Sequence, residues 1–366
     1  MFKRQGSNTQ LTESGLNPAA FDTTINNKPV KLFTLKNKSG MEVCITNFGG
    51  RVVSLTVPDK DGKPTDVVLG YDNIRQYADS VNSPSDYGST VGRYANRIDK
   101  GHLHVNGKDY QLPQNNFGHC LHGGPSGWMY QVYDAEQPND TTLVMRLMSP
   151  DGDNNFPGTV KTTATYKVLS NNTLDITFEA TTDKETVVNM TNHSYFNLNG
   201  DPSHDGENQM LYINADRYTP ADPTYMTTGE ELSVAGTPMD FVSGKTLGAE
   251  IKSDFPALKY GKGYDNCFVI DGYTPGQIQT AAELYSPESG RVLEVLTTQP
   301  GVQIYTGNWL EGCPAGKSGH VYHDYDAVAI ECQHYPDSPN KPDYPTTTLR
   351  PGEVFEQAII FSFSVR

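Results

Sequence analysis

The stretch from Asn189 to Gly200 holds the densest group of side chains that could do chemistry. It reads Asn-Met-Thr-Asn-His-Ser-Tyr-Phe-Asn-Leu-Asn-Gly. Hydrogen-bond donors, acceptors and an aromatic ring come from Asn192, His193, Ser194, Tyr195 and Asn197. This mixture suits a polyhydroxylated ligand, because each hydroxyl group can both donate and accept. A lone histidine is more often a satisfied core residue, so the case for His193 depends on these neighbours.

Glu331 is the acid that stands out, because it interrupts the otherwise apolar run Asp326-Ala-Val-Ala-Ile-Glu-Cys-Gln. A carboxylate inside an apolar strand is costly to bury unless it is paired or used in catalysis. The alternative is an exposed glutamate on the solvent face of a strand. A carboxylate and a histidine together can serve as general base and general acid.

The elements that must position these residues are predicted to be strands. Leu174 to Glu179 alternates apolar and polar residues, and the acidic run that follows predicts a turn before a second strand from Thr186 to Leu198, which carries His193. Asn106-Gly107 is typical of a two-residue hairpin turn, and Asn73 to Ser80 is compatible with one short helix.

Strand-like runs separated by turn residues fill the chain from Val30 to Val365, and we find no amphipathic helix of ten residues and no repeat of fixed period. This pattern predicts an all-β fold, organised as a single large β-sandwich. We expect residues 1–29, which lack periodicity, to form a loose N-terminal arm, and residues 30–366 to form one catalytic domain.

The composition limits the classes of partner that the protein is expected to bind. The 366 residues include 28 Lys+Arg and 43 Asp+Glu, a net charge of −15, which disfavours nucleic acid and anionic membranes and favours neutral ligands. No window approaches 18 apolar residues, and Met1 to Ala20 lacks a signal-peptide core. We therefore expect a cytoplasmic location, with the bacterial periplasm as the alternative if an export signal had been removed.

The cysteines and histidines do not form a metal signature. The five cysteines are scattered without a Cys-x-x-Cys pair and are predicted to be free thiols. None of the close histidine pairs has a second ligand cluster, so we expect neither a structural metal nor a cofactor. The tripeptide Gly316-Lys-Ser lacks the upstream glycine of a phosphate loop, because that position is Glu311.

Taken jointly, nine motifs resemble the aldose 1-epimerase family, also called galactose mutarotase. In order they are Asn47-Phe-Gly-Gly, Asp66-Val-Val-Leu-Gly-Tyr, Gly92-Arg-Tyr-Ala-Asn-Arg-Ile, Leu121-His-Gly-Gly, Phe156-Pro-Gly, Thr191-Asn-His-Ser-Tyr-Phe-Asn-Leu, Gln299-Pro-Gly-Val-Gln-Ile-Tyr-Thr-Gly-Asn, His334-Tyr-Pro-Asp-Ser-Pro-Asn and Leu349-Arg-Pro-Gly-Glu. They span roughly residues 30 to 366. The resemblance implies a single large antiparallel β-sandwich (the galactose mutarotase-like supersandwich) whose concave face holds a sugar.

The resemblance also implies roles, position by position. Glu331 matches the family's catalytic base and His193 its catalytic acid. The residues that match sugar ligands are Asn96, Arg97, His122, Tyr195, Asp265 and Gln303. Two departures are visible: the chain has Tyr264-Asp-Asn-Cys where the family usually has Asp-His-Asn after the aromatic residue, and Glu331-Cys-Gln where it commonly has Glu-Thr-Gln. These changes leave both acids in place but put the support of Asp265 in question.

The implied activity is the interconversion of α and β anomers of free aldohexoses such as glucose and galactose. An ordinary glutamate is ionised at neutral pH and a histidine beside carboxylates can be protonated, so we expect both groups to start in the required state. We expect a monomer or weak dimer that needs no cofactor. We also expect little activity on sugar phosphates, because only Arg93 and Arg97 supply positive charge near these motifs.

Two other functions remain open from the sequence. A glycoside hydrolase could use Glu331 and Asp265 as its carboxylate pair. A carbohydrate-binding protein without turnover could use Trp128, Tyr195 and Arg97 as a binding platform.

Overall fold

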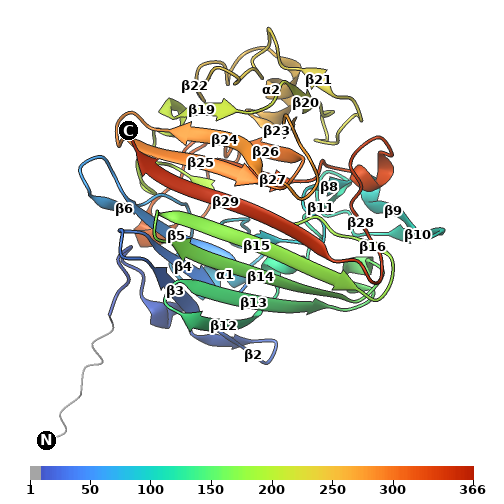
Figure 1. Cartoon of the computed structure of the whole chain (residues 1–366), viewed down its shortest axis with the longest axis horizontal. Helices are drawn as coiled ribbons and strands as arrows, with labels where there is room; N and C mark the ends of the chain where they lie inside the picture. Colours follow the sequence, from blue (N-terminus) through green and yellow to red (C-terminus); the bar gives the residue numbers. More distant parts are fainter. Residues whose placement is uncertain (1–9) are drawn as a thin grey trace, which may run out of the picture.

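One nine-stranded antiparallel sheet spans the molecule. The computed structural model describes residues 10–366. In spatial order the strands of this sheet are β12 (Asp134–Asn139), β13 (Thr142–Ser149), β14 (Val160–Leu169), β15 (Thr173–Thr182), β29 (Phe355–Val365), β25 (Arg291–Thr297), β24 (Gln279–Tyr285), β19 (Met210–Ile213) and β22 (Lys245–Thr246). Figure 1 shows them stacked in that order from the bottom of the view to the top.

Two smaller antiparallel sheets make the second layer. The six-stranded sheet contains β18 (Tyr195–Phe196), β27 (Val328–Gln333), β26 (Gly301–Tyr305), β23 (Asp265–Val269), β20 (Arg217–Thr219) and β21 (Leu232–Ser233). The four-stranded sheet contains β3 (Leu32–Lys36), β4 (Glu42–Thr46), β5 (Arg51–Pro58) and β6 (Pro64–Asp66). In Figure 1 the four-stranded sheet lies behind the lower strands of the large sheet.

The layers are held together by apolar side chains on their facing sides. Along β15 the residues Leu174, Ile176 and Phe178 are fully buried while their neighbours are more exposed, as the two-residue period of a strand requires. They share one apolar cluster with Val52 of β5 and Ile330 of β27. The sequence prediction of an all-β sandwich is therefore confirmed.

Short elements complete the described chain. Five two-stranded ladders pair β1 (Thr23–Ile25) with β2 (Lys28–Val30), β9 (His102–Val105) with β10 (Lys108–Gln111), β8 (Arg97–Ile98) with β11 (Cys120–Leu121), β16 (Thr186–Val187) with β28 (Thr348–Leu349), and β7 (Thr90–Val91) with β17 (Thr191–Asn192). The helices are α1 (Ile74–Ala78), α2 (Pro256–Gly261), and the 3₁₀ turns η1 (Pro18–Phe21), η2 (Asp99–Gly101), η3 (Trp128–Tyr130), η4 (Asp153–Asn155), η5 (Gly206–Asn208), η6 (Lys317–Gly319) and η7 (Ser338–Asn340).

Two local predictions are confirmed. Asn106 and Gly107 both have positive φ, 50° and 74°, and join β9 to β10 in a hairpin. Asn73 caps α1, because its side-chain oxygen accepts a hydrogen bond from the Gln76 amide at 2.9 Å. Among residues 10–366 no helix is longer than the six residues of α2.

The predicted single strand from Thr186 to Leu198 is wrong. The segment divides into β16, β17 and β18, which pair with three different partners, β28, β7 and β27. Asparagine side chains between them bond to main-chain groups: Asn189 Nδ2 donates to the Ala95 carbonyl at 3.2 Å, and Asn192 Oδ1 accepts from the Ser194 amide at 3.1 Å. These bonds replace a regular ladder and leave His193 between two strands.

The N-terminal segment is more ordered than predicted where it is described. Residues 1–9 lie outside the described part of the chain. From residue 10 onward the segment packs on the body, with Leu16 and Phe21 buried in an apolar cluster under β5 and α1. The first strand begins at Thr23 rather than at Val30. The division at residues 29 and 30 stays a prediction.

All five cysteines are free, as predicted. Among the described residues, no helix has the length and apolar composition needed to cross a membrane.

Candidate active site

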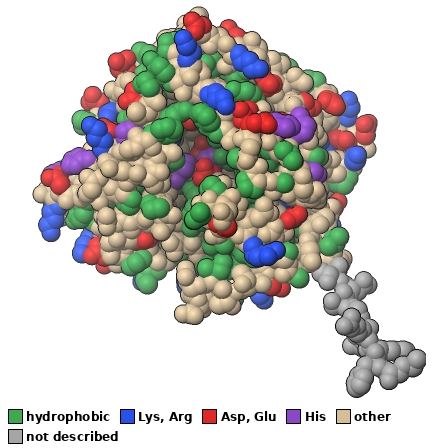
Figure 2. Space-filling view, turned by 180° about the vertical axis from the view of Figure 1, so that it is seen from behind, with side chains coloured by type: hydrophobic (Ala, Val, Ile, Leu, Met, Phe, Trp, Pro, Cys, Tyr) green, Lys and Arg blue, Asp and Glu red, His purple; other side chains and the backbone are tan. Residues whose placement is uncertain are grey.

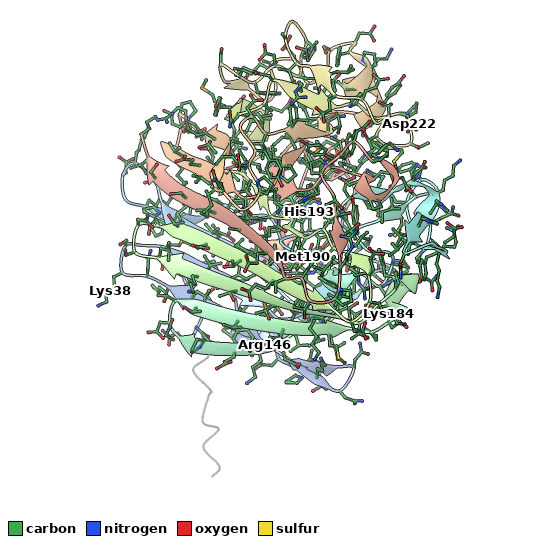
Figure 3. The ribbon with its side chains drawn as sticks, turned by 45° about the vertical axis from the view of Figure 1, so that its right-hand side comes forward. Lys38, Arg146, Lys184, Met190, His193 and Asp222 are labelled. Carbon is green, nitrogen blue, oxygen red and sulfur yellow. The ribbon has the colours of Figure 1, made fainter. Side chains whose placement is uncertain are left out.

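Glu331 and His193 form a buried pair at the centre of the site. Glu331 lies on β27, and His193 lies between β17 and β18; each is 2% exposed. His193 Nε2 is 3.2 Å from Glu331 Oε1, although the angles do not complete a hydrogen bond and Oε1 has no other partner among the described residues. Figure 3 shows His193 in the interior, whereas the labelled residues Lys38 and Arg146 lie at the periphery.

Two neighbouring strands place Asp265 and Gln303 beside this glutamate. Gln303 of β26 is directly opposite Glu331 in the ladder, and β23, which carries Asp265, pairs with the other edge of β26. Gln303 Nε2 donates to Asp265 Oδ1 at 2.8 Å, while Gln303 Oε1 is buried without a partner. Asp265 is therefore held by Gln303, and the unusual neighbour Asn266 instead donates from Nδ2 to the Thr219 carbonyl at 3.4 Å.

Arg97 supplies the positive charge of the site. Its Nε and one terminal nitrogen donate to Asn116 Oδ1 at 3.2 and 2.9 Å, and its guanidinium lies 5.0 Å from the centre of the Tyr225 ring. Asn96 precedes it with a φ of 67°, and its Oδ1 accepts from the Arg97 amide at 2.9 Å. The Asn–Arg pair is thus fixed by local bonds before any ligand arrives.

The tautomer of His122 follows from its main-chain contact. Its Nδ1 lies 3.0 Å from the backbone amide of Asn96, which can only donate, so Nδ1 accepts. Burial lowers the pKa of His122 to about 3, so the ring is neutral at physiological pH and its proton is on Nε2. His122 therefore presents a fixed hydrogen-bond donor, its Nε2–H.

Asp86, His122 and His193 have ligand atoms within 4.8 Å of one another, close enough to suggest a metal site. The donor set does not fit one. Metal binding needs an unprotonated ring nitrogen, and His122 has already committed Nδ1 to the Asn96 amide, which leaves only the protonated Nε2 facing the group. We therefore derive no step through a metal.

The pKa shifts correct the expectation that Glu331 is ionised and His193 is protonated independently of each other. Burial, and then the charges of Asp265 and Asp86, raise the pKa of Glu331 well above its ordinary value. Burial lowers the pKa of His193, although Asp86 acts in the opposite direction. Each group is pushed toward its neutral form, so the pair holds one titratable proton, on Glu331 or on His193, rather than starting as two independent ions.

Asp86, which sequence reasoning missed, faces this pair from the loop before β7. Its Oδ2 is 3.8 Å from His193 Nε2, and its side chain is 35% exposed. Burial alone would raise the pKa of Asp86, but His193, His122 and two nearby arginines lower it below the ordinary value, so Asp86 is ionised. Nothing in the loop sequence Ser83-Pro-Ser-Asp marks it as part of a site.

A cavity of about 150 Å³ reaches the pair from the side of His193: its wall includes Asp86, Asn96, Arg97, His122, His193 and Asp265, whereas Glu331 and Gln303 lie behind that wall. Sequence reasoning also missed its aromatic and amide lining, Asn116, Phe117, Tyr225, Tyr305 and Trp309. Figure 2, which views the molecule from behind, shows a hollow with histidine and acidic side chains inside it. Trp309 is 54% exposed at this cavity, where an aromatic face can stack on a sugar ring.

Three residues considered from the sequence lie elsewhere. Tyr195, like Glu331 and Gln303, is not part of the cavity wall; its ring stacks on His193 at 5.0 Å, so it positions the histidine. Trp128 is 1% exposed and belongs to the core, so it offers no sugar platform. Arg93 is buried too, and its guanidinium donates to the Pro157 carbonyl at 2.7 Å and to Ser149 Oγ at 2.7 Å.

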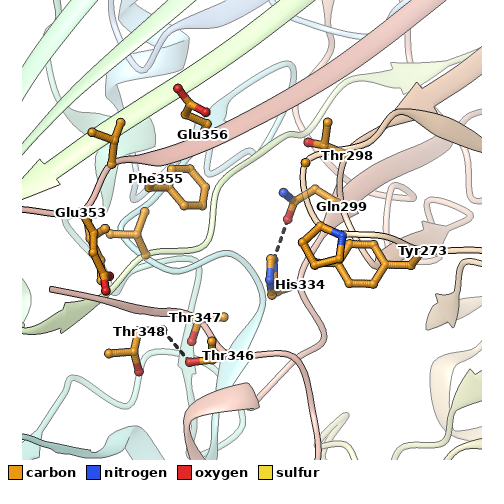
Figure 4. Close-up of a pocket in the computed structure, with 15 residues that line it drawn as sticks. Tyr273, Thr298, Gln299, His334, Thr346, Thr347, Thr348, Glu353, Phe355 and Glu356 are labelled. Atoms are coloured by element: carbon orange, nitrogen blue, oxygen red, sulfur yellow. Dashed lines mark hydrogen bonds between the residues drawn. The ribbon is translucent and has the colours of Figure 1, made fainter.

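A larger cavity of about 480 Å³ lies away from this pair, between the start of β29 and the segment after β27 (Figure 4). Its half-buried histidine, His334, has Nδ1 2.7 Å from Gln299 Oε1, and loss of solvent around the ring lowers its pKa to about 4. Within residues 10–366 no carboxylate lies within ion-pair distance of His334, so we place the chemistry at Glu331 and His193 despite the smaller volume.

The sandwich and its buried pair define an acid–base enzyme with a pocket lined by hydrogen-bonding groups. A family model described as aldose 1-epimerase matches residues 31–362. The chain is 36% identical over 338 residues to aldose 1-epimerase of Escherichia coli (strain K12), covering 92% of this chain and 96% of that protein. It is 38% identical over 336 residues to galactose mutarotase of Rattus norvegicus, covering 92% of this chain and 94% of that protein.

Solved structures agree with this match. The GalM/aldose epimerase homologue from C. elegans superposes with a TM-score of 0.84 at 34% identity, covering 92% of this chain and 99% of that one. Galactose 1-epimerase from Lactobacillus acidophilus superposes with a TM-score of 0.80 at 30% identity, covering 94% of this chain and 97% of that one. The chain belongs to the aldose 1-epimerase family.

The charge of Asp86 should set the pH range of activity. The active pair carries one proton: rising pH removes it, and falling pH adds a second. Asp86 favours protonation of both His193 and Glu331, so Asp86→Asn lowers both pKa values. Both limbs of the kcat/KM profile should therefore move to lower pH, measured by polarimetry from pH 4 to 9. Asp134→Asn, at an exposed acid on β12, is the matched control; an unmoved or upward-moving profile for Asp86→Asn would contradict this coupling.

Proposed function

We propose that the protein is an aldose 1-epimerase that interconverts the α and β anomers of free hexoses such as glucose and galactose. The observation that carries the proposal is the 3.2 Å contact between Glu331 and His193. The hydroxyl oxygen O1 and the ring oxygen O5 of a hexose are both bonded to C1. The base and the acid that act on them must therefore be neighbours, as these two groups are.

The reaction uses the one proton of the pair. With the proton on His193, the Glu331 carboxylate takes the proton of the O1 hydroxyl while His193 protonates O5. The C1–O5 bond breaks as the C1=O1 double bond forms, which gives the open-chain aldehyde. Glu331 is then protonated and His193 is neutral, and these are the forms that burial favours.

Ring closure reverses these transfers on the other face of the aldehyde. Rotation about the C1–C2 bond presents that face to the O5 hydroxyl. As O5 attacks C1, His193 takes back the O5 proton and Glu331 returns its proton to O1. The enzyme ends as it began, no electrons are gained or lost, and the net change is the configuration at C1.

The remaining site residues hold the sugar in this proposal. Arg97 and the Nε2–H of His122 donate to hydroxyl oxygens, while Asp265 accepts from hydroxyl groups and is itself fixed by Gln303. Asn96 orients Arg97 through its side-chain oxygen. Because these bonds exist without a ligand, binding orders few side chains and the loss of conformational entropy is small.

The two alternatives fit less well. A glycoside hydrolase places two carboxyl groups about 5 to 10 Å apart across the scissile bond, whereas Glu331 contacts a histidine. A binding protein without turnover has no use for a buried acid–base pair, which is costly to desolvate, and its proposed platform residue Trp128 is in the core. The relatives reported above carry the names of isomerases, not of hydrolases or binding proteins.

Removing the base should separate turnover from binding. Glu331→Gln keeps the shape of the side chain and loses the proton acceptor, so polarimetric kcat for fresh α-galactose should fall roughly 100- to 10,000-fold. Galactose binding, measured by calorimetry, should change much less. Glu179→Gln, at an exposed position on β15, serves as the control. A folded Glu331→Gln protein with the parent kcat would show that another group is the base.

The site should reject hexose 6-phosphates. A phosphate dianion needs clustered basic groups or a nest of amides. Arg97 is the only Lys or Arg that lines the described cavity, and Asp86 and Asp265 share its wall. We expect kcat/KM for glucose 6-phosphate to be roughly tenfold or more below that for glucose, a gap that added salt should narrow. Equal or higher efficiency on the phosphate would exclude free hexoses as the preferred class.

A further inference from the structure

The cavity beside His334 lies outside the active site and takes no part in the proposed chemistry. Its volume of about 480 Å³ is within the roughly 300–1,000 Å³ of typical ligand pockets. Its wall includes the loop between β23 and β24, the turn before β26, the residue after β27, the segment leading into β28 and the start of β29. Figure 4 shows Phe355 and Tyr273 on opposite sides of this space, with Gln299 and His334 between them.

His334 and Gln299 line the cavity and supply one hydrogen-bond acceptor and one donor. His334 Nδ1 lies 2.7 Å from Gln299 Oε1, which can only accept, so Nδ1 carries the ring hydrogen. The pKa of about 4 keeps the ring neutral at physiological pH, which leaves His334 Nε2 as an acceptor. The amide nitrogen Nε2 of Gln299 is the matching donor. Neither of these two nitrogens has a hydrogen-bond partner among the described residues.

Hydrogen bonds to neighbouring strands fix these two groups in place. The His334 amide donates to Asn189 Oδ1 at 3.0 Å. Thr298, which precedes Gln299, accepts at Oγ1 from the Ala358 amide of β29 at 3.0 Å, so the turn before β26 is joined to the large sheet. A ligand therefore meets a wall that is already ordered, and binding costs little conformational entropy.

The charge pattern of the cavity favours a neutral ligand. In residues 10–366 no lysine or arginine lines it, which disfavours an anion. The two lining acids do not offer a site for a cation at its centre. Glu353 Oε2 accepts from the Arg350 amide at 3.0 Å, and Glu356 lies on the opposite side of β29 from Phe355, as the alternation along a strand requires and as Figure 4 shows.

We propose that this cavity is a second, non-catalytic binding site for a neutral sugar. Two neighbouring hydroxyl groups match the two free nitrogens: one hydroxyl donates to His334 Nε2, and the other accepts from Gln299 Nε2. The half-buried rings of Tyr273 and Phe355 pack against the C–H faces of the sugar ring. No bond of this sugar is made or broken, because the acid–base pair of the active site does not line the cavity.

A titration of the histidine ring nitrogens tests the site. Protein with isotopically labelled histidine is titrated with methyl β-galactoside, whose ring cannot open, and the ring nitrogens are followed by NMR; the His334 signals are those absent from His334→Gln. We expect the His334 Nε2 signal to move to saturation. Galacturonate, an anion of similar size, should bind there roughly fivefold or more weakly, because no basic group lines the wall.

The same titration can overturn the proposal. Saturable changes confined to His193 and His122 would place the sugar in the active site alone, and no saturable change at any histidine would equally exclude the second site. Equal binding of galacturonate at His334 would exclude a site selective for neutral ligands. The proposed function stands in each case, because it depends on the turnover of galactose.

Removing one aromatic wall shows whether the sugar lies in this cavity. Tyr273→Ala should raise the Kd reported by His334 roughly threefold or more, since the sugar loses a ring contact, and should leave polarimetric kcat and KM for galactose unchanged. Tyr260→Ala removes an exposed ring on α2 that does not line the cavity, and should change none of these quantities. An unchanged Kd in Tyr273→Ala would overturn the assignment.

Discussion

The site depends on one buried contact, that between Glu331 and His193. Removing either group from water opposes its charged form, and the two penalties act in opposite directions on the proton. The result is a pair that shares a single titratable proton, which lies on Glu331 or on His193. These two arrangements correspond to the closed and open forms of a sugar, so desolvation matches the proton states of the enzyme to those of the reaction.

The surrounding structure supports this balance. Asp86 and Arg97 act on the pair from outside it: Asp86 favours the protonated histidine, and Arg97 favours the ionised glutamate. The strands and local hydrogen bonds position the other site residues. Antiparallel β23, β26 and β27 bring Asp265, Gln303 and Glu331 onto one face, and hydrogen bonds to Asn116 and Asn96 fix the Asn–Arg pair. A regular sheet therefore supplies Asp265 and Glu331, and irregular segments between short strands supply the two histidines and Asp86.

Much of the fold could be predicted from the sequence because its signals are local. Alternation along β15, the Asn106-Gly107 turn and the short helix α1 each depend on residues within a few positions. The broken segment from Thr186 to Leu198 could not be predicted, because its three short strands pair with partners far along the chain. The packing of the N-terminal segment could not be predicted for a similar reason. Phe21 is buried by an apolar cluster whose other members lie far along the chain, so the local sequence carries no sign of it.

The site residues also divide into those with a local sequence signal and those that only the folded chain brings together. Glu331 stood out because a charge in an apolar strand is unusual, and the motifs of the resemblance indicated the polar ligands. Asp86 and Tyr225 lie in loops without a pattern, and only the folded chain brings them to the cavity. Trp128 illustrates the opposite error, since its residue type suggests sugar contact, whereas its side chain is buried in the core.

The number of hydrogens on the central pair decides whether Glu331 and His193 share one titratable proton. Neutron diffraction from deuterium-exchanged, sugar-free crystals at neutral pH can locate them on the Glu331 oxygens and the His193 nitrogens. A shared proton predicts two hydrogens in total, because the neutral pair and the ion pair both carry two. One hydrogen, which would mean an ionised glutamate beside a neutral imidazole, would contradict the shared proton on which the proposed chemistry depends.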